Sequence, residues 1–246
     1  MLQFERTGIL QEYLEKHHSA TVKQIAKDIH MSETTVRRDL AYLEKQHIVR
    51  RSYGFAVLLK YQNNTLPFLL RMQDNRKEKN IIAQKAVGLV KTGDTLIMDE
   101  SSTTSLIANL LDPSMDLTVF TTSLIIANIL AEKRIRTYCT GGLIQSNTFS
   151  FSGKYAEPLI ASIYADKCFF SSSGIMENGI ICDKMEESAS INKLMLQHAE
   201  KKIYLCDHTK FNRSFPYLIA KAEDIDYFIS DSEPPESYRK QFKIVL

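Results

Sequence analysis

Residues 31–55 read MSETTVRRDLAYLEKQHIVRRSYGF, and this stretch decides the fold of the first part of the chain. Ser32 is a residue type that caps helix N-termini, and the pattern after it is helical. The apolar residues Val36, Leu40 and Leu43 recur at the spacing that places them on one helix face. The segment therefore predicts a capped amphipathic helix with one buried stripe.

The residues on either side complete a recognisable unit. Upstream, residues 3–18 have helical apolar spacing, Thr21 caps a second short helix, and His30-Met31 marks a tight break. Downstream, two β-like stretches at 48–51 and 55–59 flank Tyr53-Gly54. Three helices followed by a hairpin predict a winged helix-turn-helix domain over residues 1–59.

The outward side of the third helix carries residues suited to DNA. Its N-terminal end can enter the major groove, and the free N–H groups beside the Ser32 cap suit a phosphate. The predicted DNA-binding residues are Ser32, Thr34, Thr35, Arg37 and Arg38 on the helix, with Arg50 and Arg51 at the start of the wing. The alternative is a solvated arginine pair, partly neutralised by Asp39, on an ordinary helix.

Beyond the wing the pattern changes. Residues 60–76 contain a polar cluster and a proline, and they are interpreted as an interdomain connection that docks through Phe68, Leu69 and Leu70. From residue 77 short apolar strands alternate with helices. Strands are expected at 95–99, 117–120, 136–139, 167–171, 202–206 and 227–230, and two of the later helices at 155–162 and 187–200. This alternation predicts an α/β domain over residues 77–246, with a mostly parallel sheet covered on both faces.

Composition sets limits on function. The net charge of the 246 residues is only +2, but residues 1–60 carry +3 and the remainder −1, so a nucleic-acid surface would be local. No membrane span or signal peptide is expected, and the chain is expected in the cytoplasm. Cys139, Cys168, Cys182 and Cys206 are interpreted as reduced core residues. No metal or cofactor is expected.

Hydroxyl groups follow the first predicted strand of the second domain. Asp99 ends that strand, and Ser101, Ser102, Thr103 and Thr104 lead directly into a helix. Hydroxyls and free backbone N–H groups at a helix N-terminus make a phosphate site. The alternative is a polar turn that only caps the helix.

Other polar residues follow the later strands. Parallel sheets bind ligands at the carboxyl ends of their strands, so these residues are expected to join the same site. They are Thr121, Thr122, Ser123, Gly141, Gly142, Asp207 and Lys210. Lys210 can pair with a phosphate and Asp207 can accept a hydrogen bond from a sugar hydroxyl. A solvated loop lysine at 210, and glycines required only for a turn at 141–142, are the alternatives.

These motifs resemble the DeoR-type bacterial regulators. Arg37-Arg38-Asp39-Leu40 within residues 21–54 matches the family's recognition helix, while Tyr53-Gly54-Phe55 replaces its usual His-Gly-Gly wing. Weaker landmarks follow in the family's order at DESSTT (99–104), TTSLIIAN (121–128), TGG (140–142), SSSGI (171–175) and DHTKF (207–211), with Ser101 where the family has Gly. The resemblance implies a C-terminal domain like sugar-phosphate isomerases that binds a phosphorylated sugar effector.

The function expected from residues and resemblance together is a transcriptional regulator. It would be a repressor of a carbohydrate operon that binds double-stranded operator DNA as a homo-oligomer and responds to a sugar phosphate. A sugar-phosphate isomerase with an added DNA-binding module is one alternative. It would need a carboxylate base, but 171–174 reads Ser-Ser-Ser-Gly and leaves only Asp99 and Glu100. An architectural DNA-binding protein is the other alternative.

Overall fold

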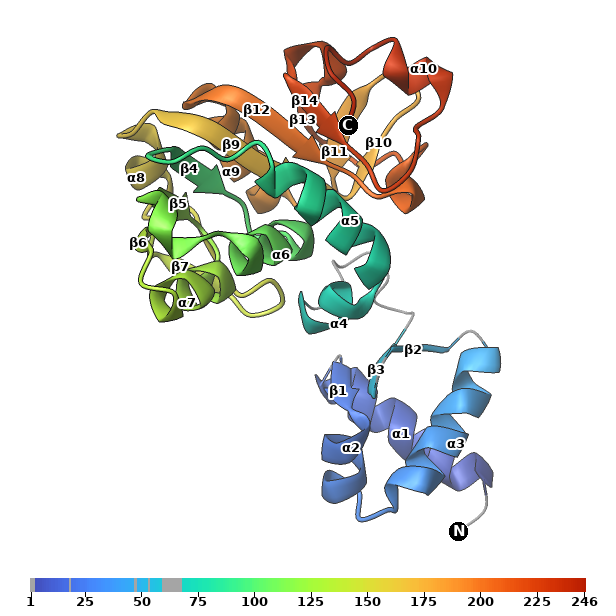
Figure 1. Ribbon diagram of the computed structural model, residues 1–246. Coiled ribbons are helices and arrows are strands. Elements are labelled where there is room, and N and C mark those ends of the chain that lie inside the picture. The colour runs from blue at the N-terminus through green and yellow to red at the C-terminus, as the bar shows by residue number, and fades with distance from the viewer. Residues whose placement is uncertain (1–2, 18, 47, 53, 59–67) are drawn as a thin grey trace. The chain divides into compact units, whose positions relative to one another are not determined.

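The computed structural model describes residues 3–17, 19–46, 48–52, 54–58 and 68–246. These residues form two compact units, 1–74 and 75–246 (Figure 1). Residues 60–67 of the expected connection lie outside the described residues, as do Leu59 at the end of the predicted second wing strand and Tyr53 at the wing turn. Phe68 is buried and begins a short helix that belongs to the first unit.

The first unit is a helix-turn-helix with a small sheet. Its helices are α1 (Gln3–His17), α2 (Val22–Asp28), α3 (Glu33–Lys45) and α4 (Phe68–Gln73). Its strands β1 (Ser19–Thr21), β3 (Phe55–Leu58) and β2 (Val49–Ser52) pair antiparallel in that order. The three helices and the hairpin of the winged helix-turn-helix are confirmed. Strand β1 was not expected, because three residues are too few to show a period of two.

The predicted caps begin α2 and α3. Thr21 Oγ1 accepts a hydrogen bond from the Gln24 N–H at 2.9 Å, and Ser32 Oγ accepts one from the Thr35 N–H at 3.2 Å. His30 has a left-handed backbone with φ of 53°, which makes the tight break between the two helices. The core of this unit contains Leu10, Leu14, Ile25, Val36, Leu40 and Leu43.

The second unit contains a six-stranded, wholly parallel sheet. Its strands are β4 (Thr95–Met98), β5 (Thr118–Thr121), β6 (Arg136–Cys139), β9 (Ala165–Ser171), β12 (Ala199–Leu205) and β14 (Tyr227–Ile229). The spatial order is β14-β12-β9-β4-β5-β6. Along the chain, β5 and β6 are added on one side of β4, and β12 and β14 are added on the other side, beyond β9. The strand order therefore reverses between β4 and β9, which is where parallel sheets bind ligands.

Helices cover both faces of this sheet, as the sequence predicted. They are α5 (Arg76–Val87), α6 (Ser102–Leu110), α7 (Leu124–Glu132), α8 (Glu157–Ala161) and α9 (Glu186–Gln197). Right-handed crossovers place α6 and α7 on one face and α9 on the other, because the two halves of the sheet grow in opposite directions. In Figure 1, α5 and α6 lie in front of the sheet and α9 behind it.

Two small antiparallel sheets and several short helical turns were not expected. One sheet orders β10 (Gly174–Ile175), β11 (Ile180–Asp183) and β13 (Tyr217–Lys221), and the other pairs β7 (Leu143–Gln145) with β8 (Ser150–Ser152). The 3-10 turns are η2 (Pro113–Met115), η3 (His208–Lys210) and η4 (Ala222–Asp224), and a short α-helix, α10, covers Glu236–Arg239. The strands of the two small sheets lie outside the alternation of strands and helices that predicted the parallel sheet, so that pattern did not indicate them.

Two helices were predicted with the wrong ends, and the helix expected over 155–162 covers only Glu157–Ala161. The helix expected over 187–200 ends at Gln197, because Ala199 already pairs with Ala165 as the first residue of β12. All four cysteines are among the described residues and are free, three of them buried and Cys139 half-buried. None of the helices in the described part of the chain is both long and apolar enough to span a membrane.

Candidate DNA interface and effector site

The third helix, α3, presents two different faces. Val36, Leu40 and Leu43 are buried in the core of the first unit. Thr34, Arg37 and Arg38 are exposed, and Thr35 is half-buried beside the cap. The predicted DNA-binding residues of this helix therefore lie together on the side that faces away from the core.

The two arginines and the acidic residue after them have separate roles. Asp39 is fully buried, and its two oxygens accept bonds from Arg6 of α1 at 2.6 and 3.0 Å. Arg38 lies 3.9 Å from the same carboxylate and is 67% exposed, while Arg37 pairs with Glu33 at 2.6 Å. Asp39 thus ties α3 to α1, and this leaves Arg38 the more available cation.

The structure separates the two wing arginines. Arg51 donates to Glu44 at 2.8 Å and to the carbonyl of Arg37 at 3.3 Å, so it lies beside α3. Arg50 directly precedes Arg51 in β2, so its side chain projects from the opposite face of the strand. It donates to both oxygens of Asp74 at 3.0 Å. Only Arg51 is brought together with the helix residues.

In the second unit, the residues predicted for the effector site lie at one edge of the sheet. Because its six strands are parallel, their carboxyl ends all meet there. Asp99 follows β4, Thr122 follows β5, and Gly141 follows β6. Ser171 ends β9, and Asp207 follows β12. Segments up to 108 residues apart in sequence are thereby gathered at a single edge.

Asp99 organises the loop between β4 and α6. Its Oδ1 accepts bonds from the Ser101 N–H at 3.0 Å and Thr104 Oγ1 at 2.5 Å, and its Oδ2 accepts the Ser171 N–H at 2.8 Å. Burial raises the pKa of Asp99, and these hydrogen bonds oppose that rise. Ser101 caps α6 through the Thr104 N–H at 3.0 Å. Asp99, Ser101 and Thr104 therefore hold the loop across the β4–β9 switch point.

Several buried polar atoms at this edge lack a hydrogen-bond partner within the described residues. They are Oγ1 of Thr103, Thr122 and Thr140, and Oδ1 of Asn192. Asn192 is on α9 and donates its amide to the carbonyl of Ser171 at 3.3 Å. A buried polar atom without a partner is costly, so such atoms together indicate a place for a polar ligand. Sequence reasoning identified Thr103 and Thr122 but missed Thr140 and Asn192.

The remaining hydroxyl residues of the predicted set differ in role. Thr121 Oγ1 donates to the Met98 carbonyl at 2.8 Å, which ties β5 to β4. Ser123 caps α7 through the Ile126 N–H at 3.3 Å. Ser102 is the first residue of α6, and like Thr103 it has a backbone N–H that no carbonyl within the helix can accept. Of these three residues, Ser102 is the one whose position suits an anion.

Charged groups gather after β12. Lys210 Nζ donates to Ser171 Oγ at 2.7 Å and lies 3.8 Å from Asp207 Oδ2, an oxygen with no hydrogen-bond partner in the described residues. Burial acts to raise the pKa of Asp207, but Lys210, Thr209 and Lys79 outweigh it and hold the pKa below its usual value. Lys79 of α5 is a buried cation that sequence reasoning did not select, since only the fold brings it near Asp207.

The two glycines after β6 are required by the backbone. Gly141 and Gly142 have φ of 67° and 110°, in the region that favours glycine. A Cβ on Gly142 would also lie 3.3 Å from the carbonyl oxygen of Ser152. The geometry of the turn therefore explains both residues without a ligand.

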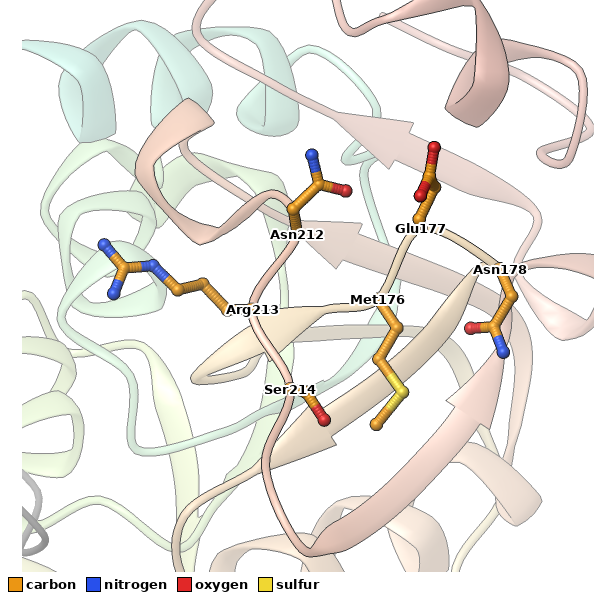
Figure 2. A pocket seen from close by; sticks show the side chains of 6 residues that line it. All are labelled: Met176, Glu177, Asn178, Asn212, Arg213 and Ser214. Carbon is orange, nitrogen blue, oxygen red and sulfur yellow. The ribbon is translucent and has the colours of Figure 1, made fainter.

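A surface depression of about 430 Å³ lies elsewhere in the second unit. It is lined by Met176, Glu177, Asn178, Asn212, Arg213 and Ser214 (Figure 2). The Arg213 side chain extends away from Glu177 and Asn178, and its Nε donates to the Thr209 carbonyl at 3.2 Å. None of the predicted effector residues lines this depression, and none of its lining residues is buried.

A winged helix-turn-helix followed by an α/β domain with a buried polar edge defines a DNA-binding regulator with a separate sensing domain. Residues 6–62 match the family model of the DeoR-like helix-turn-helix domain, and residues 74–232 match that of the DeoR C-terminal sensor domain. The chain belongs to the DeoR family of transcriptional regulators.

Relatives of known description align over nearly the whole chain. The HTH-type transcriptional regulator GolR of Listeria innocua is 34% identical, covering 99% of this chain and 96% of its own. The L-fucose operon activator of Haemophilus influenzae is 30% identical, covering 96% and 94%. The lactose phosphotransferase system repressor of Staphylococcus epidermidis is 27% identical, covering 98% and 96%.

Among solved structures, ribose 5-phosphate isomerase A of Methanocaldococcus jannaschii is similar to part of the chain. The identity is 17% and the TM-score is 0.43. The similarity covers 56% of this chain and 55% of the enzyme, so it spans only about half of that enzyme's length.

Proposed function

We propose that this regulator controls a carbohydrate operon and that its sensor domain binds a phosphorylated sugar. The observation that carries the proposal is a set of buried oxygens with no hydrogen-bond partner among the described residues, on Thr103, Thr122, Thr140 and Asn192, at the edge that also holds Lys210. Relatives named for fucose and lactose systems support a carbohydrate ligand. The predicted division into residues 1–59, 60–76 and 77–246 remains part of this proposal.

The phosphate would lie at the N-terminus of α6. The backbone N–H groups of Ser102 and Thr103 and the Thr103 hydroxyl are donors there, and the helix N-terminus carries partial positive charge. Lys210 supplies a full charge to the same edge. Thr122, Thr140 and Asn192 offer donors and acceptors that suit sugar hydroxyls.

A role in regulation suits these residues better than catalysis. An isomerase needs a carboxylate base beside the sugar carbon. At the β4–β9 switch point Asp99 has three hydrogen-bond donors, and Glu100 accepts the Ser188 hydroxyl at 2.7 Å. The residues after β9 are Ser172 and Ser173, which carry no carboxylate. The expected readout of ligand binding is therefore a change in DNA affinity.

The DNA side of the proposal rests on α3. Thr34, Thr35, Arg37 and Arg38 would read base edges in the major groove, and Ser32 and Arg51 would contact the backbone. We further propose at least a dimer in the cytoplasm, since two half-sites read together raise affinity. Relatives named as an activator and as a repressor leave the direction of control to experiment.

A thermal-shift screen tests the ligand. Glucose 6-phosphate, fructose 6-phosphate and ribose 5-phosphate are compared with the unphosphorylated sugars and with inorganic phosphate, using the full-length protein. A ligand of the folded state raises the melting temperature. At least one sugar phosphate should stabilise the protein more than its free sugar does. If free sugars and sugar phosphates act alike, the phosphate site is wrong.

A further inference from the structure

Asn75 is the first residue of the second unit and has an unusual geometry. Its φ is 51°, a left-handed conformation that few residues other than glycine adopt. It precedes α5 as the N-cap residue, yet its side chain makes no capping hydrogen bond. Asparagine usually caps a helix by accepting a backbone N–H through its side-chain oxygen, and the side-chain amide of Asn75 does not have this role.

That amide is used at the candidate effector site instead. Asn75 Nδ2 donates to Thr209 Oγ1 at 3.1 Å and to Asp207 Oδ1 at 3.4 Å. Asp207 Oδ1 also accepts the N–H and the hydroxyl of Thr209, while its other oxygen faces Lys210. Asn75 therefore contacts the carboxylate whose charge Lys210 balances.

The residue before Asn75 makes a contact of a different kind. Asp74 ends the first unit, and its carboxylate accepts two bonds from Arg50 of the wing, each at 3.0 Å. Arg50 is on β2, two residues before the strand ends at Ser52. Two adjacent residues of the chain thus bind, respectively, the wing of the DNA-binding unit and the polar edge of the sensor unit.

We infer that Asp74 and Asn75 form the regulatory link of this protein, which couples the charge at Asp207 to the wing through the peptide bond that joins them. This inference rests on the proposed function. An anionic ligand that engages Lys210 leaves Asp207 less neutralised. The Asn75 amide then binds Asp207 more strongly, since hydrogen bonds to an uncompensated charge are stronger. A shift of Asn75 moves Asp74, and the wing loses or regains its bond through Arg50.

The link can be tested without any ligand, in a double-mutant cycle on the full-length protein. The variants are Asp207→Asn and Arg50→Gln, alone and together, and the readout is the Kd for a duplex selected from a random pool by the wild-type protein. Asp207→Asn should change the Kd by about threefold or more in the protein that keeps Arg50. In the Arg50→Gln background the same substitution should change the Kd by less than about 1.5-fold, because the effects of coupled residues are not additive. Equal effects in both backgrounds, or no effect in either, would overturn the inference.

Asn75→Gly isolates the amide. Glycine keeps the left-handed backbone and removes only the side chain, so the coupling between Asp207 and Arg50 should disappear while the fold is retained. Asn212→Gly is the matched control. Asn212 also has a left-handed backbone, with φ of 56°, but its side chain bonds Tyr238, so the coupling should persist. Coupling that survives Asn75→Gly contradicts the inference.

A second arm uses glucose 6-phosphate and ribose 5-phosphate as probes, with inorganic phosphate as the bare anion. If none of these probes stabilises the wild-type protein, the proposed function is wrong for these sugar phosphates. The double-mutant cycle without ligand still tests whether Asp74 and Asn75 couple Asp207 to the wing. If one of them binds and shifts the Kd for DNA, Asn75→Gly should retain binding of that probe and lose most of the shift. An unchanged shift in Asn75→Gly counts against the link alone.

Discussion

At the scale of single residues, neighbouring side chains in the recognition helix have opposite tasks. Asp39 is fully buried against Arg6, and we expect Asp39→Ala to lower the free energy of unfolding of the first unit by about 2–4 kcal/mol, because the two partly buried hydrogen bonds that join α3 to α1 are lost. Urea denaturation followed by circular dichroism measures this. Arg37→Ala, at an exposed ion pair, is the control and should change stability by about 0.5 kcal/mol or less. Equal losses in the two variants would contradict the assignment.

Arg38 should show the reverse pattern. It is 67% exposed, so Arg38→Ala should leave stability nearly unchanged. If its guanidinium reads a base edge, operator binding should weaken by about 1–3 kcal/mol. Fluorescence anisotropy with the selected duplex measures the Kd. Arg239→Ala, an exposed arginine of the second unit, is the control, and wild-type affinity in Arg38→Ala would rule out base contact at this position.

Residue identity alone predicted part of the site. Hydroxyls and charges that follow apolar strands are visible in sequence, and Ser102, Thr103, Thr122 and Lys210 lie after strands of the parallel sheet, while their role in binding stays a prediction. Lys79 and Asn192 were not selected, because neither closely follows a strand in the sequence. Their approach to the edge depends on packing between segments more than 20 residues apart, which no local pattern records.

At the scale of elements, the turn after β6 offers a direct test of backbone constraint. Gly142→Ala places a Cβ 3.3 Å from the Ser152 carbonyl in a backbone with φ of 110°, and we expect a loss of about 1–3 kcal/mol of unfolding free energy. Gly141 has φ of 67° with open space around it, so Gly141→Ala should cost less, about 1 kcal/mol. Chemical denaturation compares the two. Equal costs would show that the contact with Ser152 is unimportant.

Elements were predictable from sequence in proportion to their length and regularity. The helices around Val36 and Ile82 and the strands of the parallel sheet have clear periods or apolar runs, and they were found with small errors at their ends. The β10-β11-β13 sheet was missed, because β11 pairs with β13 across more than 30 residues and β10 has only two residues. The sequence also had no means of showing that the Asp74–Asn75 junction binds both the wing and the site.

At the scale of the whole molecule, stability should depend weakly on pH through His208. Its Nδ1 lies 2.8 Å from Asp231 Oδ2, and this hydrogen bond raises the pKa of His208. The pair therefore stabilises the folded state fully below the unfolded pKa of about 6.5, and the contribution is lost as pH rises through the higher folded pKa. Because the ring is half exposed, the effect is at most about 1 kcal/mol.

The measurement for His208 is the difference in unfolding free energy between wild type and His208→Gln. It should be largest near about pH 6 and should shrink toward about pH 8.5. The Asp231→Asn variant should show the same trend, since it removes the other partner. A difference that grows with pH would contradict a raised pKa for His208 in the folded protein.

The central claim is that one molecule binds DNA through α3 and has that binding set by a phosphorylated sugar at the polar edge of the sensor sheet. The most direct test is the Kd for the selected duplex, measured with and without the sugar phosphate that most raises the melting temperature. Wild type should change its Kd by about fivefold or more, a coupling of the usual size. Lys210→Ala should not respond to the sugar phosphate, because the cation that engages the phosphate is removed. A Lys210→Ala protein that responds as wild type does, or a wild-type Kd that no stabilising sugar phosphate alters, would contradict this claim.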